Sequence, residues 1–235
     1  MAVSNGFRER ARRLALLHAT GVTQASPPLA LETSCMDGDA GHRGAMSSKA
    51  ESPPPDANGL YQAALTHLAR FATTEAGLRR VLTRQVDRWA LTQTDRDSVA
   101  PMIAAAREAV EEVIGRLKQA GAVSDTAFAE SRAKNLVRGG QSNRAVQARL
   151  IAKGVAPEVA RAASVSDPET ELAAALVLVR KRRIGPYRAT EDAGEAAHRK
   201  ELGVLARAGF ARDLATQALN MSRDEAESRI FNLRR

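Results

Sequence analysis

The chain has 235 residues, with 35 Lys+Arg against 27 Asp+Glu, so its formal net charge is +8. This length allows one large domain or two small ones. Hydrophobic residues make up 44% and aromatic residues only 3%, so the core must be aliphatic. Alanine alone accounts for 46 residues, and an excess of Ala, Leu, Arg and Glu is typical of helices rather than of a β-sandwich. We therefore expect an all-α protein.

The single cysteine, Cys35, excludes a disulfide framework and a cysteine-based zinc finger. No stretch approaches the roughly 20 apolar residues of a membrane span. We expect a cytoplasmic protein without membrane contact. The excess positive charge suits a polyanionic partner, either a nucleic acid or an acidic protein surface.

Residues 1–59 differ from the rest of the chain. They hold five of the nine prolines, and their six basic and six acidic side chains cancel. Such a segment cannot bury enough apolar surface to fold alone. We predict a disordered N-terminal extension ending in a proline-rich linker, apart from a possible short helix over 7–18. Met46 is an alternative start, so deletion of residues 1–45 should leave the activity unaltered.

A helical pattern begins at Leu60 and defines a first unit over 60–122. Thr74 is a predicted N-cap, and a long helix is predicted over 101–119, with Pro101 in its first turn. Between them we expect an irregular stretch at 89–97, within an insertion at 87–100. The arginines predicted to face outward from the helix after Thr74 are Arg79, Arg80 and Arg84.

A second unit, 123–165, contains three short, one-sided helices that cannot be stable alone. The first is capped by Ser124 or Asp125 and the second by Ser142, while Pro157 opens the third. The glycines that end the first two helices are Gly139, Gly140 and Gly154.

The pattern recurs in a third unit, 166–222, before a C-terminal tail at 223–235. A shift of 55 residues superposes Leu150 on Leu205, Gly154 on Gly209, Val155 on Phe210, Val159 on Leu214 and Ala163 on Ala218. Such agreement indicates a repeated unit. We predict an elongated, curved stack of three tandem three-helix repeats.

These residues resemble the RecX family of regulatory proteins. The resemblance extends roughly from Leu60 to Leu219 and rests on the segment 117–125, Phe128, Ala129, Arg138, Gly139, Gly140, Ser142, Arg144, Val146, Leu150 and 153–155, with looser similarity at 64–82 and 180–185. It implies an all-helical protein that lies in the groove of the RecA filament on single-stranded DNA. There it would block filament growth or favour disassembly, and so lower the ATPase, strand exchange and coprotease activities of RecA. The implied roles are regulation of homologous recombination, DNA repair and the SOS response.

No catalytic motif, phosphate-binding glycine loop or metal-ligand spacing is present in the sequence, so we expect neither an enzyme nor a cofactor. The most positive region that also has a helical pattern is 120–165, with seven basic and three acidic residues. We expect RecA and DNA phosphates to be contacted by Arg132, Lys134, Arg138, Arg144, Arg149, Lys153, Arg180, Lys181, Arg182 and Arg183. The last four also lie where a helix C-terminus favours cations, so we expect about two of them to be available to a partner.

Few aromatic side chains are available to stack on bases, because Phe128 and Phe210 fall at core positions. We therefore expect DNA contacts to be non-specific and salt-sensitive, made by a monomer. The alternative is a sequence-specific DNA-binding regulator, because residues 149–163 have a spacing similar to that of a helix-turn-helix. Repetition of this unit, and the scarcity of Gln, Asn and Ser on its third helix, argue against base recognition.

Overall fold

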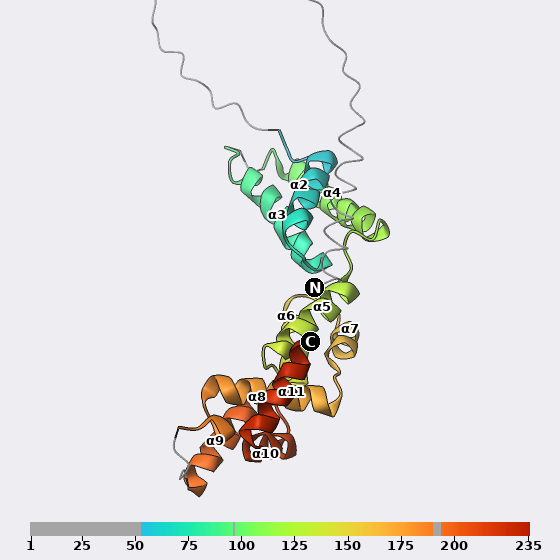
Figure 1. Cartoon of the computed structure of the whole chain (residues 1–235). Coiled ribbons are helices and arrows are strands. Elements are labelled where there is room, and N and C mark those ends of the chain that lie inside the picture. The colour runs from blue at the N-terminus through green and yellow to red at the C-terminus, as the bar shows by residue number, and fades with distance from the viewer. Residues whose placement is uncertain (1–52, 96, 190–193) are drawn as a thin grey trace, which may run out of the picture.

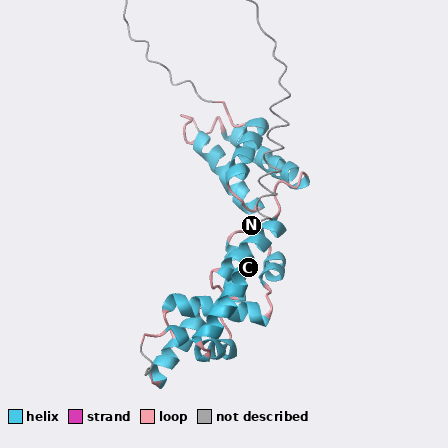
Figure 2. Ribbon diagram, viewed as in Figure 1, coloured by secondary structure: helices cyan, strands magenta, loops and turns pink. Residues whose placement is uncertain are grey.

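The computed structural model describes residues 53–95, 97–189 and 194–235. Within these residues the chain forms ten α-helices and one short 3₁₀-helix, with no strand (Figure 2). The helices stack into an elongated molecule (Figure 1), which confirms the predicted all-α fold of tandem three-helix repeats. None of the described helices is long and apolar enough to cross a membrane. The predicted disorder and short helix of the N-terminal extension fall mainly on residues 1–52, which lie outside the described residues.

The first unit comprises α2 (Ala57–Arg70), α3 (Glu75–Ala90) and α4 (Ala100–Gln119). Helix α2 begins slightly before the boundary predicted at Leu60, because the side chain of Asp56 caps it by accepting from the Gly59 N–H. Thr74 caps α3 as predicted. The three helices enclose a core of mainly aliphatic side chains, which also includes Tyr61 and extends to Val123.

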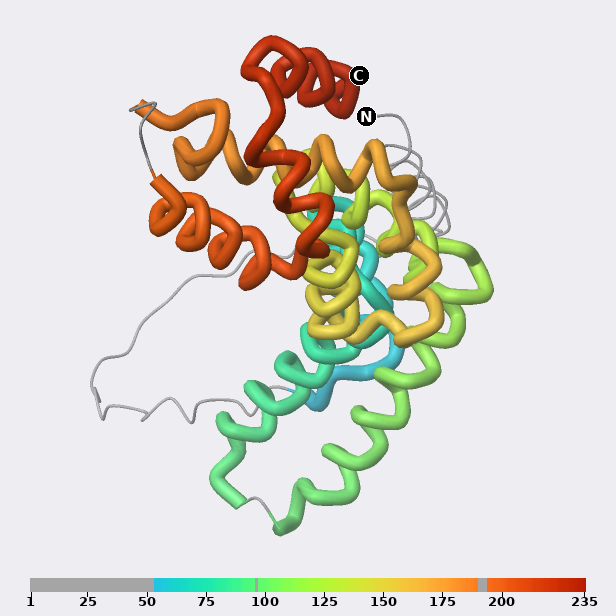
Figure 3. Tube along the Cα trace, turned by 90° about the horizontal axis from the view of Figure 1, so that it is seen from below, coloured from blue at the N-terminus to red at the C-terminus, as the bar shows by residue number. Residues whose placement is uncertain are grey.

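The sequence predicted an irregular stretch over residues 89–97, but the first two of these residues are helical. Helix α3 continues to Ala90, and Trp89 is buried on it with 8% of its surface exposed. Residues 87–90 of the insertion therefore extend α3, which forms with α4 a hairpin that projects from the stack (Figure 3). Local helix propensity does not show this extension, because the burial that stabilises a helix depends on its tertiary packing.

The second unit comprises α5 (Asp125–Arg138), α6 (Asn143–Ala152) and α7 (Pro157–Ser164). Ser124 and Ser142 cap α5 and α6 through their hydroxyl oxygens, which confirms both predicted caps. The third unit comprises α8 (Pro168–Arg182), a 3₁₀-helix η1 (Gly185–Tyr187), α9 (Glu195–Arg207) and α10 (Arg212–Asn220).

The 55-residue shift between the second and third units is preserved in the backbone. It carries the last residue of α6 onto the last residue of α9, and the first residue of α7 onto the first residue of α10. Gly154 and Gly209, which follow α6 and α9, have φ values of 89° and 90°. These left-handed conformations are costly for residues with a Cβ atom, which explains glycine at both repeats.

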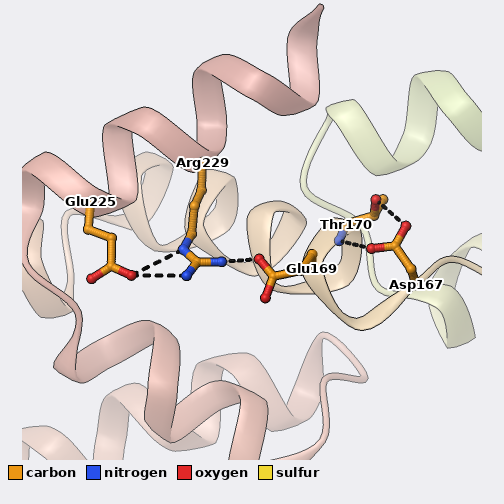
Figure 4. A network of polar contacts seen from close by, with 5 residues as sticks. All are labelled: Asp167, Glu169, Thr170, Glu225 and Arg229. Atoms are coloured by element: carbon orange, nitrogen blue, oxygen red, sulfur yellow. Dashed lines mark hydrogen bonds and ion pairs between the residues drawn. The ribbon is translucent and has the colours of Figure 1, made fainter.

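Residues 223–235, interpreted from the sequence as a tail, contain a further helix, α11 (Arg223–Arg234), that packs along α8. Ile230 is only 1% exposed and joins the core of the second and third units. Arg229 contacts Glu225 on the same helix and Glu169 on α8 (Figure 4). The C-terminal end of α11 reaches the second unit, where Leu233 lines a depression together with side chains of α5.

The apolar interior is divided in two. One cluster of buried side chains belongs to α2–α4 and the residues that follow α4, whereas a second cluster is shared by α5–α11. The second and third units therefore form one body with a common core, and the first unit forms another.

Candidate functional site

Consecutive units meet at two joints that use the same polar contacts. At the first joint, between the first and second units, the Thr74 hydroxyl donates to the carbonyl oxygen of Lys153 over 2.8 Å. At the second joint, between the second and third units, the Ser142 hydroxyl donates to the carbonyl oxygen of Ala208 over 2.6 Å. Each hydroxyl also caps its own helix, so one side chain both begins a helix and fixes the next unit.

A carboxylate and a glycine complete each joint. The Glu75 N–H donates to Asp125 Oδ1 over 2.8 Å at the first joint, and the Asn143 N–H donates to Glu171 Oε1 over 3.3 Å at the second. A Cβ atom on Gly154 would lie 2.4 Å from the Cβ of Ala76, and one on Gly209 would lie 2.7 Å from the Oγ of Ser142. Both glycines are thus required by close packing between units as well as by their backbone conformation.

The first joint carries an electrostatic cost at Asp125. Burial raises the pKa of the Asp125 carboxyl above its ordinary value, and the hydrogen bond from the Glu75 N–H opposes this only in part. The nearby Glu75 side chain is held by Lys118, with 3.0 Å between Nζ and Oε1.

A cleft with a volume of about 620 Å³ lies over the first joint. One wall is formed by a face of α3 and the end of α2, and the other by a face of α5, with the end of α6 between them. Its lining includes five cationic residues and no Asp or Glu. The cations are Arg70, Arg80, Arg84, Arg132 and Lys153.

Within the described residues, none of these five cations forms an ion pair with a carboxylate. Arg80 donates from Nη2 to the carbonyl oxygen of Lys153 over 3.2 Å, which leaves its charge uncompensated. The carboxylate of Glu111 on α4, which does not line the cleft, accepts two hydrogen bonds of 2.6 and 2.8 Å from Arg79. The cleft is thus a concentrated positive site suited to an anion.

Two aromatic side chains also line the cleft. Phe71 follows α2, contacts the ring of His67 at a centroid distance of 5.2 Å, and leaves 57% of its surface exposed. Phe128 on α5 is half-buried rather than at the centre of the core, so the sequence interpretation of its position was only partly right. An exposed ring beside unpaired cations is an arrangement suited to stacking on a nucleobase.

The structure separates the predicted binding residues of the second unit. Arg132 and Lys153 line the cleft, whereas Lys134 and Arg138 line the depression near Leu233 on another side of α5. Arg144 lies beside Gly209 at the second joint. The exposed side chain of Arg149 on α6 lines neither cavity.

The basic run at the C-terminal end of α8 includes two cations that contact other parts of the fold. Arg180 pairs with Glu227 of α11 at 2.8 Å, and the Lys181 ammonium donates to the carbonyl oxygen of Gly139 over 2.6 Å. Arg182 and Arg183 are exposed, and Arg183 adopts a left-handed conformation with φ 55°. Two of the four cations therefore stabilise the fold.

Charge along the sequence did not indicate Arg70, Arg80 and Arg84 as binding residues. Arg80 and Arg84 are four residues apart on α3 and share a face, a signal visible in the sequence. What the sequence did not show is that this face lies opposite Arg132 of the next unit. Arg79, which the sequence placed with them, is instead held by Glu111.

Comparisons with known proteins agree with this architecture. The family model for the second three-helix domain of RecX matches residues 124–163, which span α5–α7. A regulatory protein RecX from Myxococcus xanthus is 34% identical over 164 residues, covering 68% of this chain and 84% of that protein. The chain belongs to the RecX family of regulatory proteins.

Two further matches to RecX proteins concern sequence and fold separately. The regulatory protein RecX of Agrobacterium fabrum is 39% identical over 45% of this chain and 56% of its own length. The crystal structure of RecX from Lactobacillus salivarius superposes with a TM-score of 0.53 over 74% of this chain and 97% of that one. At 18% identity, this last similarity concerns the fold alone.

The described residues contain no group of three or more His, Cys, Asp or Glu side chains placed to hold a metal ion. His67 is half-buried on α2, and burial lowers its pKa. The cleft over the first joint offers positive charge and the exposed ring of Phe71. Both favour binding of a partner.

Proposed function

We propose that this chain binds the RecA filament on single-stranded DNA and restrains RecA, thereby regulating recombination and DNA repair. Membership in the RecX family carries this proposal, through the similarity to the regulatory protein RecX of Myxococcus xanthus over 84% of that protein. An elongated stack of units suits a long, repetitive filament, because contacts can be distributed along many subunits.

The physical basis of the binding is protein contact combined with phosphate contact. Exposed cations along the stack would contact RecA, among them Arg138, Arg144, Arg182 and Arg183. The DNA would be contacted through its backbone phosphates. Such binding requires no catalytic group and weakens steeply with salt, because each phosphate contact releases a condensed counterion. We expect the chain to act as a monomer in the cytoplasm.

The test is the ATPase rate of the host RecA on single-stranded DNA, titrated with the full chain. Inhibition at amounts well below one chain per RecA supports the proposal and indicates blocked filament growth. Absence of inhibition at equimolar amounts contradicts it.

A paired variant tests the surface. Reversal of Arg138 and Arg144 to Glu should weaken filament binding without loss of helical content, because both side chains are exposed. Reversal of Arg199 and Arg212, also exposed, changes the net charge equally and provides the control. Equal effects of the two double variants on filament binding would show that Arg138 and Arg144 are not part of the binding surface.

The helix-turn-helix alternative is less well supported. Helix α7 has only 8 residues, and the exposed side chains on it are those of Pro157, Glu158, Arg161 and Ala162. Among these, only Arg161 is of the type that most often recognises base edges, which is little for a sequence-specific recognition helix. Selection of a defined duplex sequence by the full chain would nevertheless establish this function.

A further inference from the structure

We propose that the cleft over the first joint is a clamp for one strand of nucleic acid, and that the bound strand fixes a hinge between the first unit and the rest of the molecule. This inference rests on the proposed function and deepens it. It locates a site for single-stranded nucleic acid in the cleft and links binding there to a movement between the first unit and the rest of the molecule. Three observations carry it: the separate cores, the charge of the cleft and the exposed ring at its edge.

The hinge follows from the division of the core. Ala122 and Val123 belong to the core of the first unit, and α5 begins at Asp125, so the covalent connection between the two bodies is centred on Ser124. Within the described residues, the helices that pack extensively against each other lie within α2–α4 or within α5–α11. The first joint is therefore held by a few polar contacts, which cost little free energy to break.

The charge of the cleft opposes its own closure. Arg80 and Arg84 on α3 face the same space as Arg132 on α5, without a carboxylate between them. Like charges on two bodies repel each other, so the empty cleft favours separation of the first unit. A polyanion between the walls converts this repulsion into attraction to both sides.

The ligand chemistry follows from the lining. Uncompensated arginines suit backbone phosphates, because a guanidinium donates two parallel hydrogen bonds to phosphate oxygens. Phe71 is 57% exposed at the same site, and an exposed ring stacks on unpaired bases only. A duplex keeps its bases stacked inside, and an acidic peptide has no base to stack on the ring, so we assign the cleft to a single strand.

Binding is tested with fluorescent oligo(dT) of about 15 nucleotides, without RecA, by anisotropy at several salt concentrations. R84E and R132E, on opposite walls, should each weaken binding and reduce the salt slope by about 1. R88E on α3 and R161E on α7 carry the same change in the same two units but outside the cleft, and should bind as the unaltered chain does. Equal losses in all four variants would contradict the assignment, because they would show only the effect of net charge.

The role of Phe71 is tested by removing its ring and, as a control, the ring of another exposed phenylalanine. F71A should weaken oligo(dT) binding at least about fivefold. F231A removes another exposed ring, 62% exposed on α11, and should have no effect. Tighter binding of duplex DNA or of poly-glutamate than of oligo(dT), or no loss in F71A, would overturn the single-strand assignment.

The hinge is measured by distances between spin labels, attached to introduced cysteines in a C35S background. Labels at Ala105 and Ala148 span the first joint, and labels at Ala148 and Gln217 span the second; all three positions are exposed. The first pair should give a broad distance distribution that narrows with oligo(dT), whereas the second should be narrow in both states. A narrow first distribution without oligo(dT), or one that bound oligo(dT) does not change, would overturn the hinge.

These measurements contain no RecA, so their outcome is independent of the filament proposal. If the chain inhibits RecA but R84E, R132E and F71A bind oligo(dT) normally, the clamp is wrong and the proposed function stands. If the clamp variants lose oligo(dT) binding but the chain leaves RecA unaffected, the clamp stands and the proposed function is wrong.

Discussion

The first and second joints are built from corresponding residues but held by different interiors. Thr74 and Gly154 at the first joint occupy the places of Ser142 and Gly209 at the second, and both hydroxyls donate to a carbonyl oxygen of the following unit. Only the second joint also lies within a continuous apolar core, to which α11 contributes Ile230. The repeated sequence thus specifies how units are oriented, whereas shared burial determines whether they move as one body.

The largest expected effect comes from removing core volume on either side of the first joint. Leu82 and Leu176 are both fully buried, one in each core. Substitution of either by Ala should lower the free energy of unfolding of its own body by about 2–5 kcal/mol. Hydrogen exchange should accelerate in α2–α4 for Leu82→Ala and in α5–α11 for Leu176→Ala. Acceleration throughout the chain in both variants would show a single cooperative body instead.

The two joint glycines provide a more direct comparison. Alanine at Gly154 or Gly209 carries a backbone cost of roughly 1–2 kcal/mol, because both φ values are near 90°. At the first joint, the clash between the added Cβ and Ala76 is relieved when the first unit moves away. Gly154→Ala should therefore lengthen the distance across that joint. At the second joint the shared core resists such movement, so Gly209→Ala should appear chiefly as lost stability.

Spin-label distances and urea unfolding of the same two variants distinguish these outcomes. A lengthened distance at both joints would mean that the shared core does not stiffen the second. Unchanged distances at both joints would mean that the loss of stability comes entirely from the unfavourable backbone conformation of alanine at these positions.

The capping hydroxyls should have intermediate effects. Thr74→Val and Ser142→Ala each remove an N-cap and a contact between units, and each should cost about 1–2 kcal/mol in urea unfolding. Thr74→Ser and Ser142→Thr retain the hydroxyl and should preserve most of the stability. Loss of stability in these conservative variants would indicate that packing, rather than the hydroxyl, matters at the joint.

The smallest effect is a pH dependence at the first joint. Burial raises the pKa of the Asp125 carboxyl in the folded state, so the folded state binds the proton more tightly than the unfolded state. The stability contributed by this group is therefore present below the ordinary carboxyl pKa and is lost as the pH rises through the raised value. Asp125→Asn retains an oxygen to accept from the Glu75 N–H and should gain stability relative to the unaltered chain as the pH rises from about 3 to about 7. A difference independent of pH would contradict this prediction.

Local signals explain why much of the architecture was predictable. Thr74, Ser124 and Ser142 act as caps through bonds to residues three positions away, so their roles are contained in short segments. Gly154 and Gly209 were identified by the repeat because the left-handed turn after each helix needs glycine. Helix α11 was missed because its pattern is weak by itself and its burial depends on α8.

The candidate site was predictable only in part, for a related reason. Arg132 and Lys153 were selected from local charge, but the other three of the five cations in the cleft, Arg70, Arg80 and Arg84, belong to another unit. Arg180 and Lys181 were selected on the same grounds, yet they bind Glu227 and the Gly139 carbonyl. Charge along the sequence does not reveal which cations already have a partner in space.

The sequence by itself determined most of the helices of the three repeats, several of their caps, the repeat and the family, because each depends on contacts between near neighbours or on the order of residues. The tertiary structure decided which units share a core, where α11 packs and which cations face each other across the first joint. Those features depend on side chains far apart in the sequence, such as Arg84 and Arg132, whose proximity arises only when one unit is placed against the next.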